Sequence, residues 1–364
     1  MDQAYDQLGR AADFFNRVIP GGDVASLIGG DEGDGRGRAL RATVRACSDW
    51  RSCPMRNAFW SQGEHAMFLG TGFASGFDVI AHELTHGVTA ATSALIYSGE
   101  SGAMNESLSD VFAELAEQTE LGPRTDWLMG EDLHVAGVPS PIRDLRDPTR
   151  QLQGPHSGQP DRLHSPLFRT ASSCSWDNDF CYVHLNSGVG NKTGYLITAG
   201  GAFNGQTVVG IGVAKAARLY WEVERRLSPR AGYLDLGRVL NAACRGLVGS
   251  VGFTAADCLN VARATTATEI APPPAPSLTV RWPARLTGTV VVTGRLLGRP
   301  AGTPVVLRRR ATILWVTVAR ATTDSTGAFR LVWSPRTSPR AGTFRVEVAG
   351  RPVLLSPTRI LVPG

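Results

Sequence analysis

The amino-acid sequence predicts an α+β protein with two domains, a mixed domain over residues 1–270 and a small all-β sandwich over residues 278–364. Apolar side chains recur at helical spacing around residues 76–89 and 102–117. Beyond the proline-rich segment 271–277, short runs alternate between apolar and polar residues and are separated by Gly and Pro. Because proline stiffens a linker, we place the domain boundary in this segment. A chain of 364 residues is long enough for two domains.

The first expected element is a helix over residues 2–18, whose apolar stripe consists of Tyr5, Leu8, Ala12, Phe15 and Val18. Residues 20–40 are rich in Gly and Asp and lack periodicity, so we expect a surface loop. Acidic side chains in such a loop offer ligands for Ca²⁺. Plain flexibility is the simpler interpretation.

The segment 76–89 carries H-E-L-T-H at its centre. Residues four apart lie on one face of a helix, so His82 and His86 can turn their rings toward one point, with Glu83 about 100° further round. Two imidazoles so placed suit Zn²⁺. The alternative is a core helix that happens to carry two histidines. A buried helix is expected in either case, because the flanking residues are Val79, Ile80, Leu84 and Val88.

A second helical segment supplies a candidate third ligand, Glu106. A catalytic zinc needs three protein ligands and an open position for water. Asp110, one turn further, is placed to accept the spare N–H of a ligating histidine. A solvated acidic face is the alternative, but the H-E-L-T-H motif and the acidic pair support each other.

These segments resemble the thermolysin-like zinc metallopeptidases whose third ligand is a glutamate. The resemblance covers most of residues 1 to about 270, with H-E-L-T-H, L-I-Y at 95–97, G-A-M-N-E-S-L-S-D at 102–110 and H-L-N-S-G at 184–188, in family order. It implies that His82, His86 and Glu106 bind Zn²⁺ and that Glu83 is the general base. It also implies a β-rich upper lobe and an α-helical lower lobe, with helices over 192–228 and 234–266.

The resemblance places the helix at 2–18 directly before the active-site cleft. The family's first strands and its pro-segment are therefore expected to be missing from this sequence. Three explanations stay open: a fragment, a wrongly assigned start codon, or a reduced lobe. The missing strands and pro-segment bear on whether this chain folds and is active. They do not change its resemblance to the family.

The resemblance also assigns substrate-binding residues. N-A-F-W at 57–60 matches an edge strand that holds the substrate backbone, so Asn57 and Ala58 are expected to bind an extended peptide, with an ordinary strand as the alternative. Arg143 is expected to bond a substrate carbonyl; an ordinary surface arginine is the other interpretation. The pocket for the side chain after the cleaved bond is expected to be lined by Val79, Met129 and Ile142. These apolar side chains predict cleavage on the amino side of Leu, Phe, Ile or Val.

Two oxyanion donors follow from the same resemblance. Tyr97, in L-I-Y, and His184, in H-L-N-S-G, are expected to donate to the developing oxyanion, with His184 oriented by Asp179. The family has Asn-Gly-Gly where this chain has Phe180-Cys181-Tyr182. A bridge between Cys174 and Cys181 would stiffen this loop and narrow the cleft.

Structural Ca²⁺ is the second metal that the resemblance implies. Hard cations take several carboxylate oxygens, and acids that converge unpaired repel one another. The expected ligands are Asp78, Glu117, Asp126 and Glu131. One residue is inserted between Glu117 and Asp126 relative to the family. The resemblance therefore allows either one or two bound calcium ions.

The six cysteines form three close pairs, Cys47/Cys53, Cys174/Cys181 and Cys244/Cys258. Of the 15 possible connectivities, local pairing is the simplest. A cysteine zinc site is less favoured, because no C-x-x-C occurs. Three disulfides predict an oxidising, extracellular setting and hence a secreted protein, although no signal peptide is visible at the start of the sequence.

The net charge of +5 is unevenly distributed. Residues 278–364 contain 14 Arg, no Lys and two acidic residues, a net +12, so the remainder carries −7. Nucleic-acid binding is therefore not expected of the first domain. The second domain resembles the immunoglobulin-like accessory domains of secreted bacterial enzymes. Its arginines would suit contact with an acidic cell wall or polysaccharide, and a solvated basic face is the favoured alternative.

Together these features predict a monomeric, zinc-dependent endopeptidase that acts on peptide or protein substrates. No run of 18 apolar residues occurs, so no membrane span is expected. One alternative is a catalytically impaired or truncated scaffold that binds surfaces, but neither a zinc ligand nor Glu83 is lost. A zinc hydrolase of lipids or glycans is another, against which the peptide-binding residues Asn57 and Arg143 argue.

Overall fold

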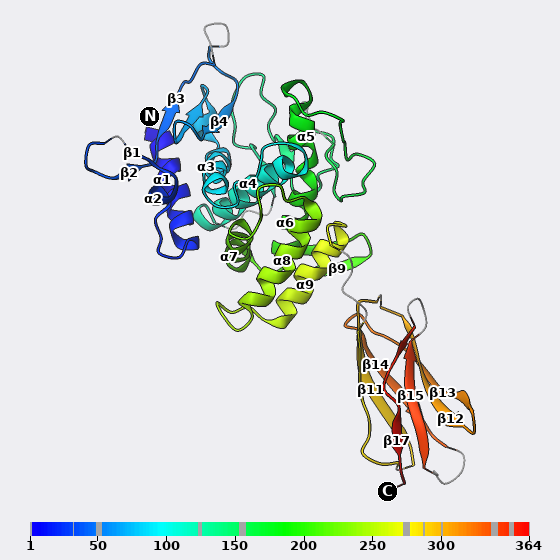
Figure 1. Cartoon of the computed structure of the whole chain (residues 1–364). Helices are drawn as coiled ribbons and strands as arrows, with labels where there is room; N and C mark the ends of the chain where they lie inside the picture. The colour runs from blue at the N-terminus through cyan, green and yellow to red at the C-terminus, as the bar shows by residue number, and fades with distance from the viewer. Residues whose placement is uncertain are drawn as a thin grey trace. The chain divides into compact units, whose positions relative to one another are not determined.

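The structure is a computed structural model of the chain. It describes residues 2–31, 33–48, 53–122, 126–152, 158–271, 277–286, 288–299, 301–335, 341–348 and 353–363. They form two compact units, Met1–Pro272 and Pro273–Gly364, each with its own apolar core (Figure 1). The mixture of helices and small sheets confirms the α+β class. Of the expected linker 271–277, residues 272–276 lie outside the described residues.

The N-terminal part of the first unit is a small three-stranded sheet with two helices. Its elements are α1 (Asp2–Val18), α2 (Val24–Ile28), β1 (Gly30–Asp31), β2 (Arg38–Ala39), β3 (Ala42–Val44), β4 (Ala58–Ser61), β5 (Ala66–Leu69) and η1 (Phe73–Ser75). The sheet order is β3-β5-β4, with β3 parallel and β4 antiparallel to β5. Within the described residues, β4 is therefore an edge strand, the position expected for a strand that accepts a peptide.

The helix expected at residues 2–18 is confirmed as α1, and most of its expected apolar stripe faces the core: Phe15 is buried, and Leu8, Ala12 and Val18 pack against the core. Tyr5 is 80% exposed, whereas Phe14 and Phe15 are buried. Both Phe rings pack against Phe112, with centroids 6.4 and 5.5 Å away. Phe14 therefore joins the buried face, and Tyr5, at the N-terminal end of the expected stripe, points to solvent.

Residues 20–40 were expected to form a surface loop without regular structure. They instead contain α2 and the paired strands β1 and β2. Asp23 caps α2 by accepting a hydrogen bond from the backbone N–H of Ser26, at 2.9 Å. Val24 and Ile28 are buried in the core of the unit. Two apolar side chains four residues apart, preceded by a capping Asp, were the signal for this short helix.

Two adjacent buried helices form the centre of the first unit, α3 (Phe77–Ala91) and α4 (Gly99–Glu120) (Figure 1). In α4 both the apolar stripe and the acidic face are buried, so the face of Glu106, Asp110 and Glu117 is not solvated. Two short strands, β6 (Leu128–Met129) and β7 (Arg143–Asp144), pair beyond α4. Buried carboxylates need hydrogen-bond partners or cations, so the buried acidic residues of α4 are candidates for a functional site.

Helices dominate the rest of the unit, in agreement with the expected α-helical lower lobe. The elements are η2 (Trp176–Asn178), α5 (Asp179–Asn186), α6 (Gly188–Thr198), β8 (Gly200–Phe203), β9 (Gln206–Val209), α7 (Val213–Glu224), α8 (Tyr233–Leu247) and α9 (Ala255–Ala267). The β8–β9 hairpin interrupts the helices expected over 192–228. Its turn is Asn204-Gly205, both with positive φ, a dipeptide that favours tight hairpins.

All three disulfides predicted from cysteine spacing are present: Cys47–Cys53, Cys174–Cys181 and Cys244–Cys258. The third joins α8 to α9. The second closes the loop that precedes His184. Among the described residues, no helix combines the length and apolar content that a membrane span requires.

The second unit consists of two antiparallel sheets around an apolar core. Its strands are β10 (Ser277–Arg281), β11 (Val290–Leu297), β12 (Pro304–Ala311), β13 (Leu314–Thr322), β14 (Ala328–Trp333), β15 (Gly342–Val348), β16 (Leu354–Leu355) and β17 (Arg359–Leu361). One sheet has the order β10-β11-β14; the other is β13-β12-β15-β16, with β17 also on β15. Alternate residues of β12 and β15 are buried, including Val305, Leu307, Phe344 and Val346. Among these described strands, β16 and β17 are short additions that both pair with β15.

Candidate metal centre

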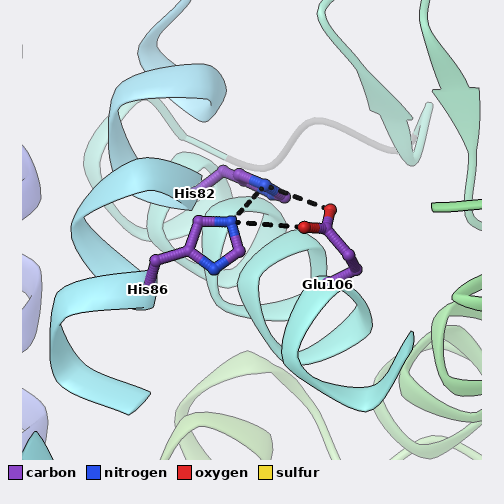
Figure 2. Close-up of side chains that lie close together, drawn as sticks. All are labelled: His82, His86 and Glu106. Carbon is purple, nitrogen blue, oxygen red and sulfur yellow. Dashed lines mark hydrogen bonds and ion pairs between the residues drawn. The ribbon is translucent and has the colours of Figure 1, made fainter. Parts of the chain in front are cut away.

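Helices α3 and α4 bring His82, His86 and Glu106 to one point. The two histidines project from α3 toward Glu106 on α4 (Figure 2). Their Nε2 atoms are 3.0 Å apart, and each lies 3.5 Å from a different carboxylate oxygen of Glu106. One ligand atom from each side chain therefore falls within 4.8 Å of the others. The spacing argument from the sequence predicted this convergence.

The contacts of the two Nδ1 atoms, on His82 and His86, decide which ring nitrogen of each imidazole carries the proton. Nδ1 of His82 is 2.8 Å from Oδ1 of Asp110, and Nδ1 of His86 is 2.7 Å from Oδ1 of Asn105. Both oxygens accept, since the amide nitrogen of Asn105 donates to the carbonyl of Leu95. Both Nδ1 atoms therefore carry the proton. The two Nε2 atoms then present lone pairs to each other beside a carboxylate, an arrangement that a cation stabilises.

This donor set fits Zn²⁺. Ligand atoms about 2.0–2.1 Å from a tetrahedral Zn²⁺ lie roughly 3.3 Å from one another, and the observed separations are 3.0 and 3.5 Å. Within the described part of the chain, Oε2 of Glu106 is buried and has no hydrogen-bond partner. Two imidazoles and one carboxylate are the ligand count of a catalytic zinc, which keeps a fourth position for water.

The charges around the centre favour an ionised Glu106. Burial opposes ionisation, but the charges of His184, His86, His82 and Arg143 outweigh it and lower the pKa of Glu106 to about 2. Burial also lowers the pKa of His86, which keeps its ring neutral. A neutral imidazole and an ionised carboxylate are the forms that bind metal.

Glu83 follows His82 on α3, and its side chain is buried, with 7% exposure. Its negative charge favours the protonated forms of the His82 and His86 rings and of the Tyr97 phenol. A carboxylate so close to the two imidazoles, and not itself in the ligand cluster, is placed for proton transfer at the metal.

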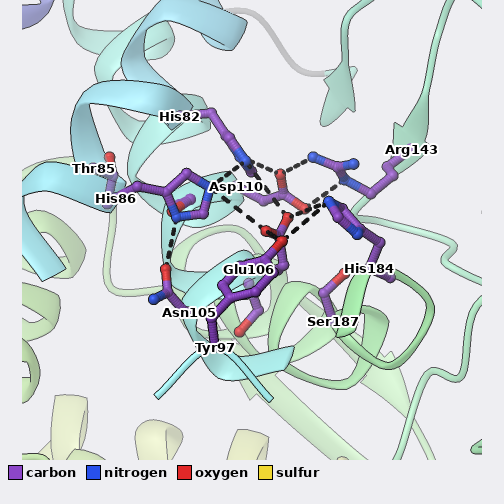
Figure 3. Close-up of polar contacts among 12 residues, drawn as sticks. His82, Thr85, His86, Tyr97, Asn105, Glu106, Asp110, Arg143, His184 and Ser187 are labelled. Carbon is purple, nitrogen blue, oxygen red and sulfur yellow. Dashed lines mark hydrogen bonds and ion pairs between the residues drawn. The ribbon is translucent and has the colours of Figure 1, made fainter. Parts of the chain in front are cut away.

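Tyr97 and His184 lie beside Glu106 (Figure 3), and Asp179 contacts His184. The Tyr97 hydroxyl donates to Oε1 of Glu106 and lies 3.3 Å from Nε2 of His184. Asp179 holds His184 from the other side, with Oδ1 2.7 Å from Nδ1 and Oδ2 accepting from the backbone N–H at 2.9 Å. Burial lowers the pKa of His184, but Glu106 and Asp179 outweigh it and raise the pKa. The structure thus places both expected oxyanion donors next to the metal ligands.

Asp179 belongs to a left-handed turn, Asp179–Tyr182. Its four residues have φ of 53°, 48°, 72° and 63° and include no glycine. This conformation costs about 1–2 kcal/mol per residue with a side chain. Cys181, the third residue of the turn, is bonded to Cys174. The family places glycines at 181 and 182, so this chain holds by other means a turn that glycine adopts freely.

Arg143 does not lie on the surface. It is buried, and its guanidinium binds the Asp110 carboxylate through two contacts, Nε–Oδ2 at 2.7 Å and Nη2–Oδ1 at 2.5 Å (Figure 3). Asn191 donates to the same Oδ2 at 2.8 Å. Burial opposes the charge on Asp110, but Arg143 and His82 outweigh it and hold the pKa of Asp110 well below its usual value. Asp110 thus connects Arg143 to the zinc ligand His82.

Asn105 and Asn191 are site residues that the sequence did not indicate. Asn105 holds the ring of His86, and Asn191 completes the hydrogen bonds of Asp110. Position was the available signal for Asn105, which precedes Glu106 on α4. Asn191 lies on α6, whose approach to α4 only the fold decides.

The residues expected to bind substrate lie on β4, α3, β6 and the segment before β7. Asn57 precedes β4, and its carbonyl accepts from the N–H of Gly70 at 2.9 Å. Ala58 is buried and pairs with Leu69. Of the expected pocket residues, Val79 and Met129 are buried and Ile142 is half-buried. Met129 and Ile142 are adjacent, with a backbone hydrogen bond of 2.7 Å between them.

A second set of acids lies at the far end of α4, and its membership differs from the expected one. The structure brings together Glu114, Glu117 and Asp126, and also Glu117, Glu131 and Asp132. Asp78 is in neither of these groups; its carboxylate accepts from the N–H groups of Val79 and Gly130, and its charge acts on Glu114 and Glu131, so its role as a calcium ligand stays a prediction. Burial raises the pKa of Asp78 to about 6.

Glu114 and Asp132 are the members that sequence reasoning missed. The burial of Glu114 makes it the more informative of the two. Glu114 is only 1% exposed, and burial together with the charge of Glu117 raises its pKa well above the usual value. Among the described residues, Oε1 of Glu114 and Oδ1 of Asp126 are buried without a hydrogen-bond partner. Several buried carboxylates with unsatisfied oxygens fit Ca²⁺, which takes six to eight oxygen ligands.

Comparisons with known proteins agree with this geometry. Two family models match, "Thermolysin metallopeptidase, catalytic domain" over residues 27–90 and "Thermolysin metallopeptidase, alpha-helical domain" over residues 93–269. The chain is 43% identical over 282 residues to a zinc metalloproteinase of Renibacterium salmoninarum, covering 74% of this chain and 49% of that protein. It is 33% identical over 224 residues to a thermolysin of Alicyclobacillus acidocaldarius subsp. acidocaldarius, covering 60% and 38%. It thus spans about half or less of these relatives.

A solved structure is also similar, the precursor of protealysin, a metalloproteinase from Serratia proteamaculans. The TM-score is 0.55 at 27% sequence identity, covering 74% of this chain and 78% of that one. The two matched models together include His82, His86, Glu106 and His184. Residues 27–269 therefore place this chain in the thermolysin metallopeptidase family.

Proposed function

We propose that this chain is a secreted zinc endopeptidase that hydrolyses peptide bonds on the amino side of bulky hydrophobic residues. The observation that carries the proposal is the pair of Nε2 lone pairs, on His82 and His86, facing the ionised carboxylate of Glu106. Three disulfides in the chain support secretion.

In this proposal His82, His86 and Glu106 hold Zn²⁺. When bound, Zn²⁺ lowers the pKa of a water toward ~7 and polarises the scissile carbonyl. Glu83 accepts the proton of the attacking water and passes it to the leaving amine. Tyr97 and His184 donate to the developing oxyanion, a contribution of about 2.7–4 kcal/mol per donor in comparable sites.

The substrate lies in this proposal as an extended strand against the edge of β4, bound by the backbone at Asn57 and Ala58. The side chain after the cleaved bond enters a pocket lined by Val79, Met129 and Ile142. Arg143 contributes to the wall of this pocket while it remains bound to Asp110. The apolar character of the lining supports a preference for bulky hydrophobic side chains.

Zinc analysis and a peptidase assay test this proposal. We expect about one zinc per chain and cleavage of furylacryloyl dipeptides with Leu or Phe after the scissile bond. Replacing that residue by Gly removes its burial in the pocket, and kcat/KM should fall at least ~10-fold, since one methylene alone changes it by 10-fold or more. A chelator should abolish cleavage and added zinc restore it. Zinc binding without any peptide cleavage would instead favour a surface-binding scaffold.

Structural calcium at the acids around Glu114 gives a separate prediction. Ligands that bind only the folded state stabilise it, by about 2.7 kcal/mol at a ligand concentration 100 times Kd. We expect the melting temperature to rise with added Ca²⁺, and to rise less in Glu114→Gln. Glu64→Gln, on an exposed turn, is the matched control. A melting temperature independent of Ca²⁺ would contradict this assignment.

Three statements from the sequence stay predictions. These are the monomeric state, the immunoglobulin-like character of the second unit, and its contact with an acidic cell wall or polysaccharide. The net charge of +12 over residues 278–364 supports the contact.

A further inference from the structure

We propose that the Cys174–Cys181 bridge is a positioning element of the active site. It holds the left-handed turn, Asp179–Tyr182, in the conformation that directs Asp179 at His184. The inference concerns the same site as the proposed function, and it relies on that function only where the rate of peptide cleavage is measured. Neither cysteine belongs to the possible metal-ligand groups that the described residues form, so the bridge acts through Asp179.

The contacts of Asp179 show why the turn must keep its shape. Both carboxylate oxygens bind His184, one at the ring nitrogen at 2.7 Å and one at the backbone N–H at 2.9 Å. Asp179 is five residues before His184, and the left-handed turn makes up most of the chain between them. A change of φ at any of these residues redirects the side chain of Asp179. The ring of His184 would then lose the acceptor that fixes it.

The other interactions of the loop are hydrogen bonds and ring contacts, the latter including Phe180 with Tyr97 at 6.0 Å and Arg169 over the Tyr182 ring at 5.8 Å. The Asn178 side chain accepts from the N–H groups of Ser175 at 2.9 Å and Cys181 at 3.0 Å, and the N–H of Phe180 donates to Ser175 at 2.8 Å. Residues 171–177 are exposed, so water competes for these hydrogen bonds. Trp176, 83% exposed, touches only the edge of the Phe180 ring among the described aromatic contacts.

The bridge is the covalent restraint on this loop. Cys174 is exposed, whereas Cys181, inside the left-handed turn, is buried with 6% exposure. The bond therefore ties an exposed loop to a buried residue with positive φ. Cysteine has a Cβ that disfavours the left-handed region, so the bridge replaces the freedom that glycine would provide.

A pair of double variants tests this relation in the zinc-loaded full chain. In C174S/C181S the bridge is absent and a side chain remains at 181, so kcat should fall by about 10-fold or more, up to the roughly 10²–10³-fold loss of a whole oxyanion donor. KM and zinc content should be unchanged. In C174S/C181G the bridge is also absent, but glycine accepts the positive φ and most of kcat should return. The control is C244S/C258S, which removes the bridge between α8 and α9 and should keep kcat.

A double-mutant cycle shows whether the effect passes through Asp179. Residues that act as a unit are not additive. In the background of Asp179→Asn, which weakens the same contact directly, removing the bridge should change kcat less than twofold. A merely structural bridge would give the same fold-loss in both backgrounds.

A readout without turnover separates this inference from the proposed function. The Nδ1–H proton of His184 donates to a carboxylate and should give a low-field NMR signal, assigned by its loss in Asp179→Asn. The signal should vanish in C174S/C181S and persist in C174S/C181G and C244S/C258S. If the chain cleaves no peptide but its variants show this NMR pattern, the proposed peptidase function is refuted and the positioning role of the bridge stands. The inference is overturned if C174S/C181S keeps both signal and kcat, or if the glycine variant is equally impaired.

Discussion

Glu83→Gln is expected to eliminate peptide cleavage while zinc stays bound. Glutamine has the same shape as glutamate, so the buried position on α3 is preserved. Its amide cannot accept a proton from the attacking water. A positioned general base contributes about 10²–10⁴-fold, and here the same group also returns the proton to the leaving amine. We expect kcat to fall by at least ~10³-fold.

The measurement is kcat on casein and on a furylacryloyl dipeptide, with zinc determined in the same samples. Glu64→Gln makes the same chemical change on an exposed turn and should keep full activity. The ligand variant Glu106→Gln should, in contrast, lose zinc as well as activity. Casein cleavage by zinc-loaded Glu83→Gln would exclude Glu83 as the base.

Asp110→Asn should destabilise the first unit and weaken zinc binding together. Asp110 is fully buried and binds the guanidinium of Arg143, itself only 6% exposed. Removing one partner of a buried ion pair leaves an uncompensated charge, at a cost of about 3–5 kcal/mol. The same change deprives His82 of the carboxylate that fixes its tautomer. Loss of such a partner weakens metal binding by about 10–100-fold.

Denaturant unfolding with chelator and zinc titration of the folded protein measure the two effects separately. Combining Asp110→Asn with Arg143→Met removes the unpaired charge, so stability should recover while zinc affinity stays low. Asp235→Asn is the control, because its pair with Arg238 is exposed and worth about 0–1 kcal/mol. If Asp110→Asn lowered the free energy of unfolding no more than Asp235→Asn does, a buried charge network at the metal would be contradicted.

Local spacing made the metal centre predictable. His82 and His86 are four residues apart on one helix, and the periodicity of α4 places Glu106 and Asp110 on one face. The three cysteine pairs were predictable because short separations favour local bridges. The alternation beyond residue 278 likewise predicted two-sided strands.

Contacts between distant segments decided the remainder. Arg143 was expected at the substrate, and its bond to Asp110 depends on how β7 approaches α4. In α1 the burial of Phe15 was predicted, but the burial of Phe14 against Phe112 and the exposure of Tyr5 depend on how the helix packs against the rest of the unit.

The sequence by itself determined that His82 and His86 can face one point, because a helix fixes the spacing of its own side chains. The packing of α4 against α3 then brings Glu106 to the same point. Only the tertiary structure decided that Glu114 and Asp132 join the second set of acids. It also decided the left-handed conformation of Asp179–Tyr182, which the identities of these residues disfavour. Burial and backbone conformation at these positions depend on the surrounding chain, and local periodicity carries no information about them.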